Sequence, residues 1–199
     1  EPLLSEDVVL KGSPVKKTKL NEAMGTTEWT LKNGIQVIVK QTPYEADAIN
    51  IEAVADGGAA IFSDEDYYSA QMLSSVMSMS GISKFSASDL RKQLSGKNAR
   101  VNVGVGTYQH AIEGTAALKD AETMFQLMYL NFTAPRFSED DFATLMKRYD
   151  AMLANQLTNP DFVFGQQLMK TLYSDNYRRQ QLTPEILSAV KLERMQDIH

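Results

Sequence analysis

The chain contains two histidines, His110 and His199, whose imidazoles could bind a metal ion or exchange a proton near neutral pH. His110 lies in a run that predicts a strand, and Glu113 follows three residues later. Because the side chains of a strand alternate between its two faces, His110 and Glu113 point to opposite sides and do not form a ligand pair. His199 is terminal. We therefore predict that His110 is a surface or half-buried strand residue, and that neither histidine binds metal.

Four serines in one predicted helix are candidates for a nucleophile: Ser74, Ser75, Ser78 and Ser80. None of them stands in the G-x-S-x-G sequence that exposes a catalytic serine at a strand-to-helix turn. Small residues on a helix that packs against a sheet explain these serines well. We therefore predict no serine chemistry.

Anion binding has two candidate groups. Gly104 and Gly106 lie between predicted strands, and no helix begins there to hold a phosphate. A bulge or a close approach of backbone is the better interpretation. Lys16, Lys17 and Lys19 form a small basic cluster, but the chain carries 20 basic and 25 acidic residues, a net charge of −5. Because nucleic-acid surfaces show a basic excess, we predict no nucleic-acid partner and a solvated linker around these lysines.

Tyr67 and Tyr68 stand beside acidic residues at the start of the same predicted helix. Either could contact a peptide, because tyrosine combines an apolar ring with a polar tip. Packing in the core or at its rim is the interpretation we favour for both.

The composition is that of a globular domain with one core. Of the 199 residues, 43% are hydrophobic and 23% are charged. The absence of cysteine excludes disulfides and thiolate metal sites, and it does not decide between the cytoplasm and the periplasm. Of these two compartments we slightly favour the periplasm. No apolar run approaches the roughly 18 residues of a membrane span, and residues 1–12 do not resemble a signal peptide. Because the chain begins with Glu1 rather than Met, we expect that a precursor or a larger protein was cut.

The elements that position these residues begin with strands. Two apolar runs flank Asn33-Gly34, a strong hairpin signal. A third run, residues 48–55, leads to Gly57-Gly58 and then to a helix over residues 64–80, which Ser63 caps and Gly81 ends. The later predicted elements are a helix from 86 to 96, antiparallel strands at 99–106 and 108–114, and helices at 116–130, 138–157 and 160–173. Thr183-Pro184-Glu185 then caps a short helix, and the next helix is predicted at 191–198. This order predicts an α+β fold, a two-layer module with a mainly antiparallel sheet packed against helices.

Five segments carry a family resemblance through their order and spacing: Trp29–Gly34, Gly57-Gly58, Ser86–Leu90, Leu94–Lys97 and Leu127–Phe137. Together they resemble a module of the pitrilysin/insulinase-type zinc peptidases, the inverted-motif family. In catalytic modules of that family, the helix after the Gly-Gly turn carries H-x-x-E-H, which supplies two zinc ligands and a general base.

The resemblance implies no catalytic or metal site in this chain. Met72 and Val76 are plausible occupants of the two histidine slots, with Ser75 in the base slot, and no shift of register supplies a histidine. Family catalytic modules take a third ligand, a glutamate, from a later helix. Asp150 is the only acid beyond the first turn of the helix over 138–157. We predict no catalytic, cofactor-binding or metal-binding residue here, and we expect zinc in the catalytic module of the full-length protein.

The resemblance also implies a place in a longer protein, because long bacterial members have two halves of two modules each. We expect residues 1–26 to be the linker between the halves, with residues 8–10 forming a short strand or packing on a neighbour. Residues 27–199 are expected to be the non-catalytic third module, incomplete at its C-terminus. The family's substrate-gripping arginine–tyrosine pair belongs to its last module. It is therefore not assigned to the cluster of Tyr177, Arg178 and Arg179.

Two functional hypotheses follow from the resemblance. The first is a non-catalytic domain of a zinc-dependent endopeptidase that helps to enclose peptide substrate in a clamshell chamber, with the remaining modules of the same polypeptide as partners. The second is a structural or binding subunit, a catalytically dead homologue. We expect the isolated chain to bind no zinc and to cleave no peptide. An H-x-x-E-H motif elsewhere in the same polypeptide would favour the first hypothesis.

Overall fold

The computed structural model describes residues 2–4, 8 and 10–199. It divides into two compact units, residues 1–48 and residues 49–199. The fold is α+β, as predicted, and the described strands form two antiparallel sheets where the sequence predicts one. No helix in the described part of the chain has the length and apolar character needed to cross a membrane.

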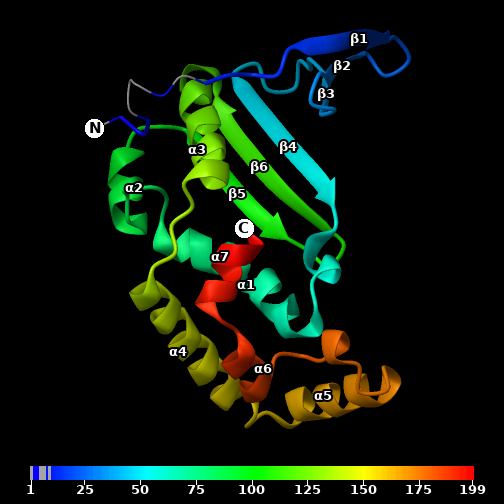
Figure 1. Ribbon diagram of the computed structural model, residues 1–199, viewed down its shortest axis with the longest axis vertical. Coiled ribbons are helices and arrows are strands. Elements are labelled where there is room, and N and C mark those ends of the chain that lie inside the picture. The colour runs from blue at the N-terminus through cyan, green and yellow to red at the C-terminus, as the bar shows by residue number, and fades with distance from the viewer. Residues whose placement is uncertain (1, 5–7, 9) are drawn as a thin grey trace. The chain divides into compact units, whose positions relative to one another are not determined.

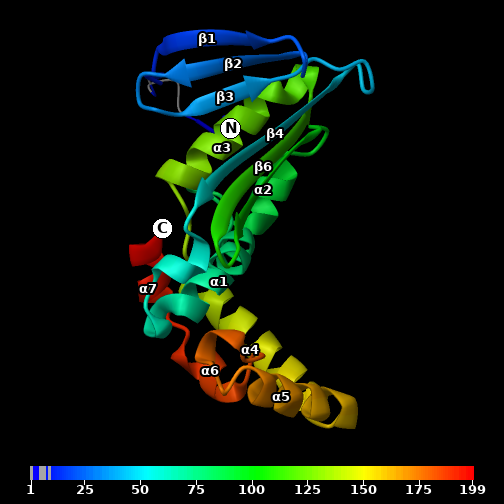
Figure 2. The same ribbon diagram turned by 90° about the vertical axis from the view of Figure 1, so that its right-hand side faces the viewer.

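The first unit contains a three-stranded antiparallel sheet in the order β1-β2-β3 (Figure 2). Its strands are β1 (Val15–Asn21), β2 (Thr26–Leu31) and β3 (Gln36–Val39). The predicted hairpin at Asn33-Gly34 is confirmed, and Gly34 has a φ of 92°. β1 lies within the segment predicted as a linker, where its lysine-rich, mostly exposed sequence gives no strand signal. The expected strand at 8–10 includes Val9, which lies outside the described residues.

The second unit contains the sheet β4-β6-β5. Its strands are β4 (Ala48–Asp56), β5 (Ala99–Val105) and β6 (Gln109–Ala117), and β5 pairs antiparallel with β6 as predicted. Helix α3 (Ala121–Thr133) lies along one face of this sheet (Figure 1). Ala99, Ala116 and Met124 form the small core between them.

The larger core of this unit is helical. Helix α1 (Asp64–Ser80) packs against α4 (Glu139–Gln156), α6 (Pro184–Ala189) and α7 (Leu192–Ile198). Val76, Leu153 and Met195 are almost completely buried at the centre of this cluster. The other described helical segments are α2 (Ala87–Gln93), α5 (Pro160–Leu172) and the short turns η1 (Gly58–Ile61), η2 (Leu118–Asp120) and η3 (Tyr177–Arg179).

The start of α3 is the largest error among the predicted helix boundaries. The sequence predicts a helix from Ala116, but β6 extends to Ala117 and η2 precedes α3. Alanine favours helices, yet Ala116 is paired with Ala99 and is only 1% exposed. Pairing and burial in the sheet therefore override the local preference.

Candidate functional site

Helix α1 follows the Gly57-Gly58 turn and presents two different faces. Met72 and Val76, 7% and 0% exposed, pack into the core with α4 and α7. Ser74, Ser75 and Ser78 lie on the side that borders a cavity. The predicted histidine slots at Met72 and Val76 are therefore closed core positions, where a ligand would have no access to an open site.

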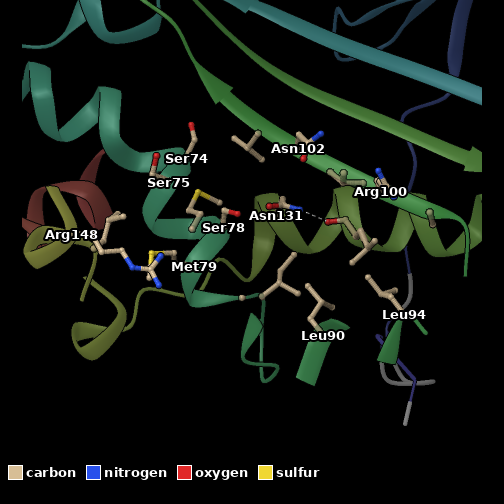
Figure 3. A pocket seen from close by; sticks show the side chains of 18 of the residues that line it. Ser74, Ser75, Ser78, Met79, Leu90, Leu94, Arg100, Asn102, Asn131 and Arg148 are labelled. Carbon is tan, nitrogen blue, oxygen red and sulfur yellow. Dashed lines mark hydrogen bonds between the residues drawn. The ribbon is translucent and has the colours of Figure 1, made fainter. Parts of the chain in front are cut away.

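The cavity has a volume of about 660 Å³ and lies between α1, α2, α3, α4 and β5. Figure 3 shows three serines of α1 on one side, Asn102 and Arg100 of β5 on another, and Arg148 of α4 near Met79. No aspartate or glutamate is among the lining residues. We call this space the serine cavity. Its wall combines hydroxyls, amides and two guanidinium groups with apolar side chains, among them Leu90 and Leu94.

Strand β5 borders the serine cavity with an unpaired edge. Gly106, directly after β5, donates its N–H to the Gln109 carbonyl of β6 at 2.8 Å. Val105 donates its N–H in the opposite direction, to the Ser74 hydroxyl at 3.2 Å. Hydrogen-bonding direction alternates along an antiparallel strand, so Val101 and Val103 also direct their N–H and C=O groups away from β6. No described strand pairs with this side, which we call the open edge of β5.

The Gly57-Gly58 turn holds the start of η1 against the β5–β6 hairpin. Gly57 donates its N–H to the Tyr108 carbonyl at 2.7 Å, and the Gly58 N–H points to Nδ1 of His110 at 3.4 Å. Gly58 has a φ of 56°, and a side chain there would collide with the Gly106 carbonyl. His110 is thus a strand residue that contacts this turn.

The described residues contain no group of three or more histidine, aspartate or glutamate side chains that could hold a metal ion. Asp150, the acid considered as a third ligand, is exposed on α4 beside a different pocket. The His199 ring nitrogen Nε2 lies 2.8 Å from the Asn131 carbonyl oxygen. The donors that zinc requires do not converge in the described part of the chain.

Tyr67 and Tyr68 are core residues, as predicted, with 2% and 7% of their surfaces exposed. The Tyr68 hydroxyl donates to the carbonyls of Tyr177 and Gln180, at 2.7 and 3.0 Å. Burial, together with the neighbouring Tyr177 and Tyr67, raises the pKa of Tyr68 to about 12. Tyr68 therefore anchors the η3 segment to α1 as a neutral donor.

Arg178 is tied to the segment that leads into α1. Its guanidinium donates to the carbonyls of Ala60 and Phe62, at 3.0 and 2.7 Å, and to the Asp64 carboxylate. It also lies over the ring of Tyr67, 5.0 Å from the centroid. These contacts engage the guanidinium in holding the η3 segment to the start of α1.

Asp66 and Arg194 form a second link, which the sequence alone did not reveal. Arg194 of α7 donates through Nε and Nη2 to the two carboxylate oxygens of Asp66, at 2.8 and 2.6 Å. Hydrogen bonds from Arg194 lower the pKa of Asp66. The two residues are 128 positions apart, so no local pattern connects them.

Comparison with known proteins identifies relatives by sequence but no family model. No protein-family model matches the chain. Proteins of similar sequence include the probable zinc protease PqqL of Escherichia coli K12, 24% identical over 154 residues. That match covers 77% of this chain and 16% of PqqL, so the chain spans about a sixth of this relative.

Solved structures share the fold over nearly the whole chain. The crystal structure of the periplasmic protease PqqL from E. coli aligns with a TM-score of 0.81 at 20% identity, covering 98% of this chain and 21% of that one. A peptidase M16 inactive domain from Pseudomonas fluorescens aligns with a TM-score of 0.69 at 17% identity, covering 87% of this chain and 42% of the other. The fold is thus found both in a protease and in a domain described as inactive.

Proposed function

Since the chain is a zinc protease-like domain of the M16 (pitrilysin/insulinase) type, we propose that it is a non-catalytic module of a zinc-dependent endopeptidase and forms part of the wall that encloses peptide substrate. Its partners are the other modules of a longer polypeptide, consistent with its match to only 16% of PqqL. Zinc and the activation of water belong to a different module. This chain contributes a surface for the peptide and excludes bulk water.

The observation that carries this proposal is the cavity side of α1. If the register of the family motif is shifted by one residue from Met72 and Val76, its three positions fall on Gln71, Ser74 and Ser75. Two of these residues line the serine cavity. An amide and two hydroxyls cannot replace two zinc-binding histidines and the glutamate that acts as general base. The side chains on this side of α1 instead suit hydrogen bonding to a peptide.

The open edge of β5 gives the peptide a defined way to bind. An extended segment can add to an unpaired strand through main-chain hydrogen bonds, while pockets beside the strand receive alternate side chains. Val101 and Val103 offer the main-chain groups, and the serine cavity lies beside them. This arrangement accepts many sequences, because the main-chain bonds do not depend on side chains.

Hydrogen–deuterium exchange tests this function on the purified 199-residue chain. A saturating unstructured octapeptide is expected to slow exchange at the amides of Val101 and Val103. Gly104 is the internal control, since its N–H already faces β6. The same peptide with alternate N-methylated residues is expected to lose this protection. Unchanged exchange at both valines in the presence of the unmodified peptide would rule out binding at the open edge.

A structural or binding subunit without any catalytic module is the second candidate, and the match to an inactive domain favours it. The two candidates differ in the rest of the polypeptide. An H-x-x-E-H motif elsewhere in the same polypeptide supports the peptidase module, and its absence supports the subunit. For the 199-residue chain itself, we expect no stoichiometric zinc by metal analysis and no cleavage of a quenched peptide. EDTA-sensitive cleavage by this chain would overturn both candidates.

A further inference from the structure

The charged side chains that line the serine cavity are all basic. The chain has five more acidic than basic residues, yet the lining of this cavity includes Arg100 and Arg148 and no acid. From this we infer that the module prefers a peptide segment that carries a carboxylate. The inference rests on the proposed function, because it concerns the same open edge and the same cavity.

Neither guanidinium of the cavity is already engaged. Within the part of the chain that the structure describes, Arg100 and Arg148 have no hydrogen-bond or ion-pair partner. Arg178 and Arg194, in contrast, are each bound to a carboxylate of α1. A guanidinium has five N–H donors and binds carboxylates in a planar, two-pronged geometry. The N–H donors of Arg100 and Arg148 are therefore still able to bind a carboxylate, whereas Arg178 and Arg194 already bind carboxylates within the fold.

The two arginines approach the cavity from different elements. Arg148 comes from α4, near Met79 of α1, and Arg100 comes from β5 on the far side of the three serines (Figure 3). Side chains of a peptide strand paired with β5 would point alternately toward the helices and away from them. A carboxylate on the helix side would meet Arg148, and the Ser78 hydroxyl, which is exposed on the same lining, adds a donor.

Nucleic acid is a poor alternative for this anion site. Its binding surfaces need an extended basic stripe, and this chain has a net charge of −5. A peptide carboxylate has two sources, an acidic side chain and a free C-terminus, and both offer the same two oxygens. The preference is therefore stated for a carboxylate, and the two sources are separated by the choice of peptides.

Fluorescence anisotropy with labelled octapeptides measures the preference on the purified 199-residue chain. One peptide alternates valine and glutamate and has an amidated C-terminus. The second replaces glutamate by glutamine and is also amidated, and the third is the glutamine peptide with a free C-terminus. We expect the glutamate peptide to bind about tenfold more tightly than the amidated glutamine peptide at low salt, with the ratio falling as salt rises. Tighter binding of the third peptide alone would assign the carboxylate to the C-terminus.

Substitution of Arg148 tests whether this residue causes the preference for a carboxylate. Arg148→Gln is expected to reduce the glutamate-to-glutamine ratio to near one, and Arg148→Lys to retain part of it, since lysine keeps the charge but not the planar fork. Lys147→Gln is the matched control, because it removes the same charge from the adjacent exposed position of α4, outside this cavity. Circular dichroism establishes that each variant is folded.

The outcomes separate the two proposals. If the amidated glutamate and glutamine peptides bind equally well, and a free C-terminus adds nothing, the carboxylate preference is wrong and the peptide-binding function stands. Equal loss of the ratio in Lys147→Gln and Arg148→Gln would also overturn it, since general charge would then explain the effect. If no peptide binds, the proposed function fails together with the preference.

Discussion

At the scale of single residues, arginines occupy two different situations in this molecule. Arg178 and Arg194 hold α1 through carboxylates in its first turn, Asp64 and Asp66. Arg148 lines a cavity without a partner among the described residues. The sequence shows acids at the start of the helix, which suit its dipole, but the arginine partners lie more than 100 positions away. Only the folded chain distinguishes an arginine that builds the fold from one that is free to bind.

Asp66 gives a prediction at this scale. Its pKa is lowered in the folded protein by Arg194, so the pair stabilises the fold above the ordinary pKa near 3.8 and loses this effect as the pH falls through the lower folded value. Asp66→Asn is therefore expected to lower Tm at pH 7, with the difference from wild type narrowing below about pH 4.

Thermal unfolding followed by circular dichroism between about pH 2 and pH 7, the range in which carboxylates titrate, provides the measurement. Glu65→Gln is the control, because the Glu65 side chain is 73% exposed and lies 3.8 Å from Lys191. A Tm difference for Asp66→Asn that stays constant over the whole range would contradict the assigned role.

At the scale of elements, the first residues of three helices show which capping interactions the local sequence predicts correctly. Ser63, Ser86 and Ser138 each precede acidic residues and predict N-caps. Ser86 and Ser138 do accept hydrogen bonds from the backbone N–H groups of Asp89 and Asp141. Ser63 occupies the N-cap position of α1, but its side chain makes no such bond. The contacts of Arg178 and Arg194 hold the start of α1 in its place.

This difference predicts unequal effects of the same substitution. Ser138→Ala removes a capping hydrogen bond of 3.2 Å and is expected to lower the free energy of unfolding by about 1 kcal/mol. Ser63→Ala removes no cap, only a long hydrogen bond of 3.4 Å to the Asp66 carboxylate, and is expected to change the free energy of unfolding by less than about 0.5 kcal/mol. Urea denaturation of both variants measures the two values. A larger loss for Ser63→Ala would show that caps do not control these helix starts.

At the scale of the whole molecule, burial is unevenly shared within residues 49–199. Ten residues of α1 are buried, and none of α5 is. Phe164, Leu168 and Leu172 of α5 are 68%, 44% and 65% exposed. Since helix stability in proteins comes mainly from packing of the apolar face, α5 has much less support than α1.

Hydrogen exchange is expected to follow this distribution. Amides of α5 open locally at low cost, because few tertiary contacts are lost, whereas those of α1 require disruption of the helical core. We therefore expect exchange in α5 to be at least roughly tenfold faster than in the buried turns of α1, measured by mass spectrometry on the 199-residue chain. Protection in α5 equal to that in α1 would indicate that α5 is covered in solution.

The sequence by itself determined the α+β class, the Asn33-Gly34 hairpin, the bounds of α1 and the β5–β6 pair. These features are encoded within a few neighbouring residues, by turn chemistry and by the period of apolar side chains. It also determined that α1 carries no histidine. The division of the strands between two sheets, the later start of α3, the serine cavity and the state of each arginine were decided by tertiary structure. Each of these features depends on contacts between residues that are far apart in the sequence. Strand pairing and burial create such contacts, and the local preferences of single residues do not predict them.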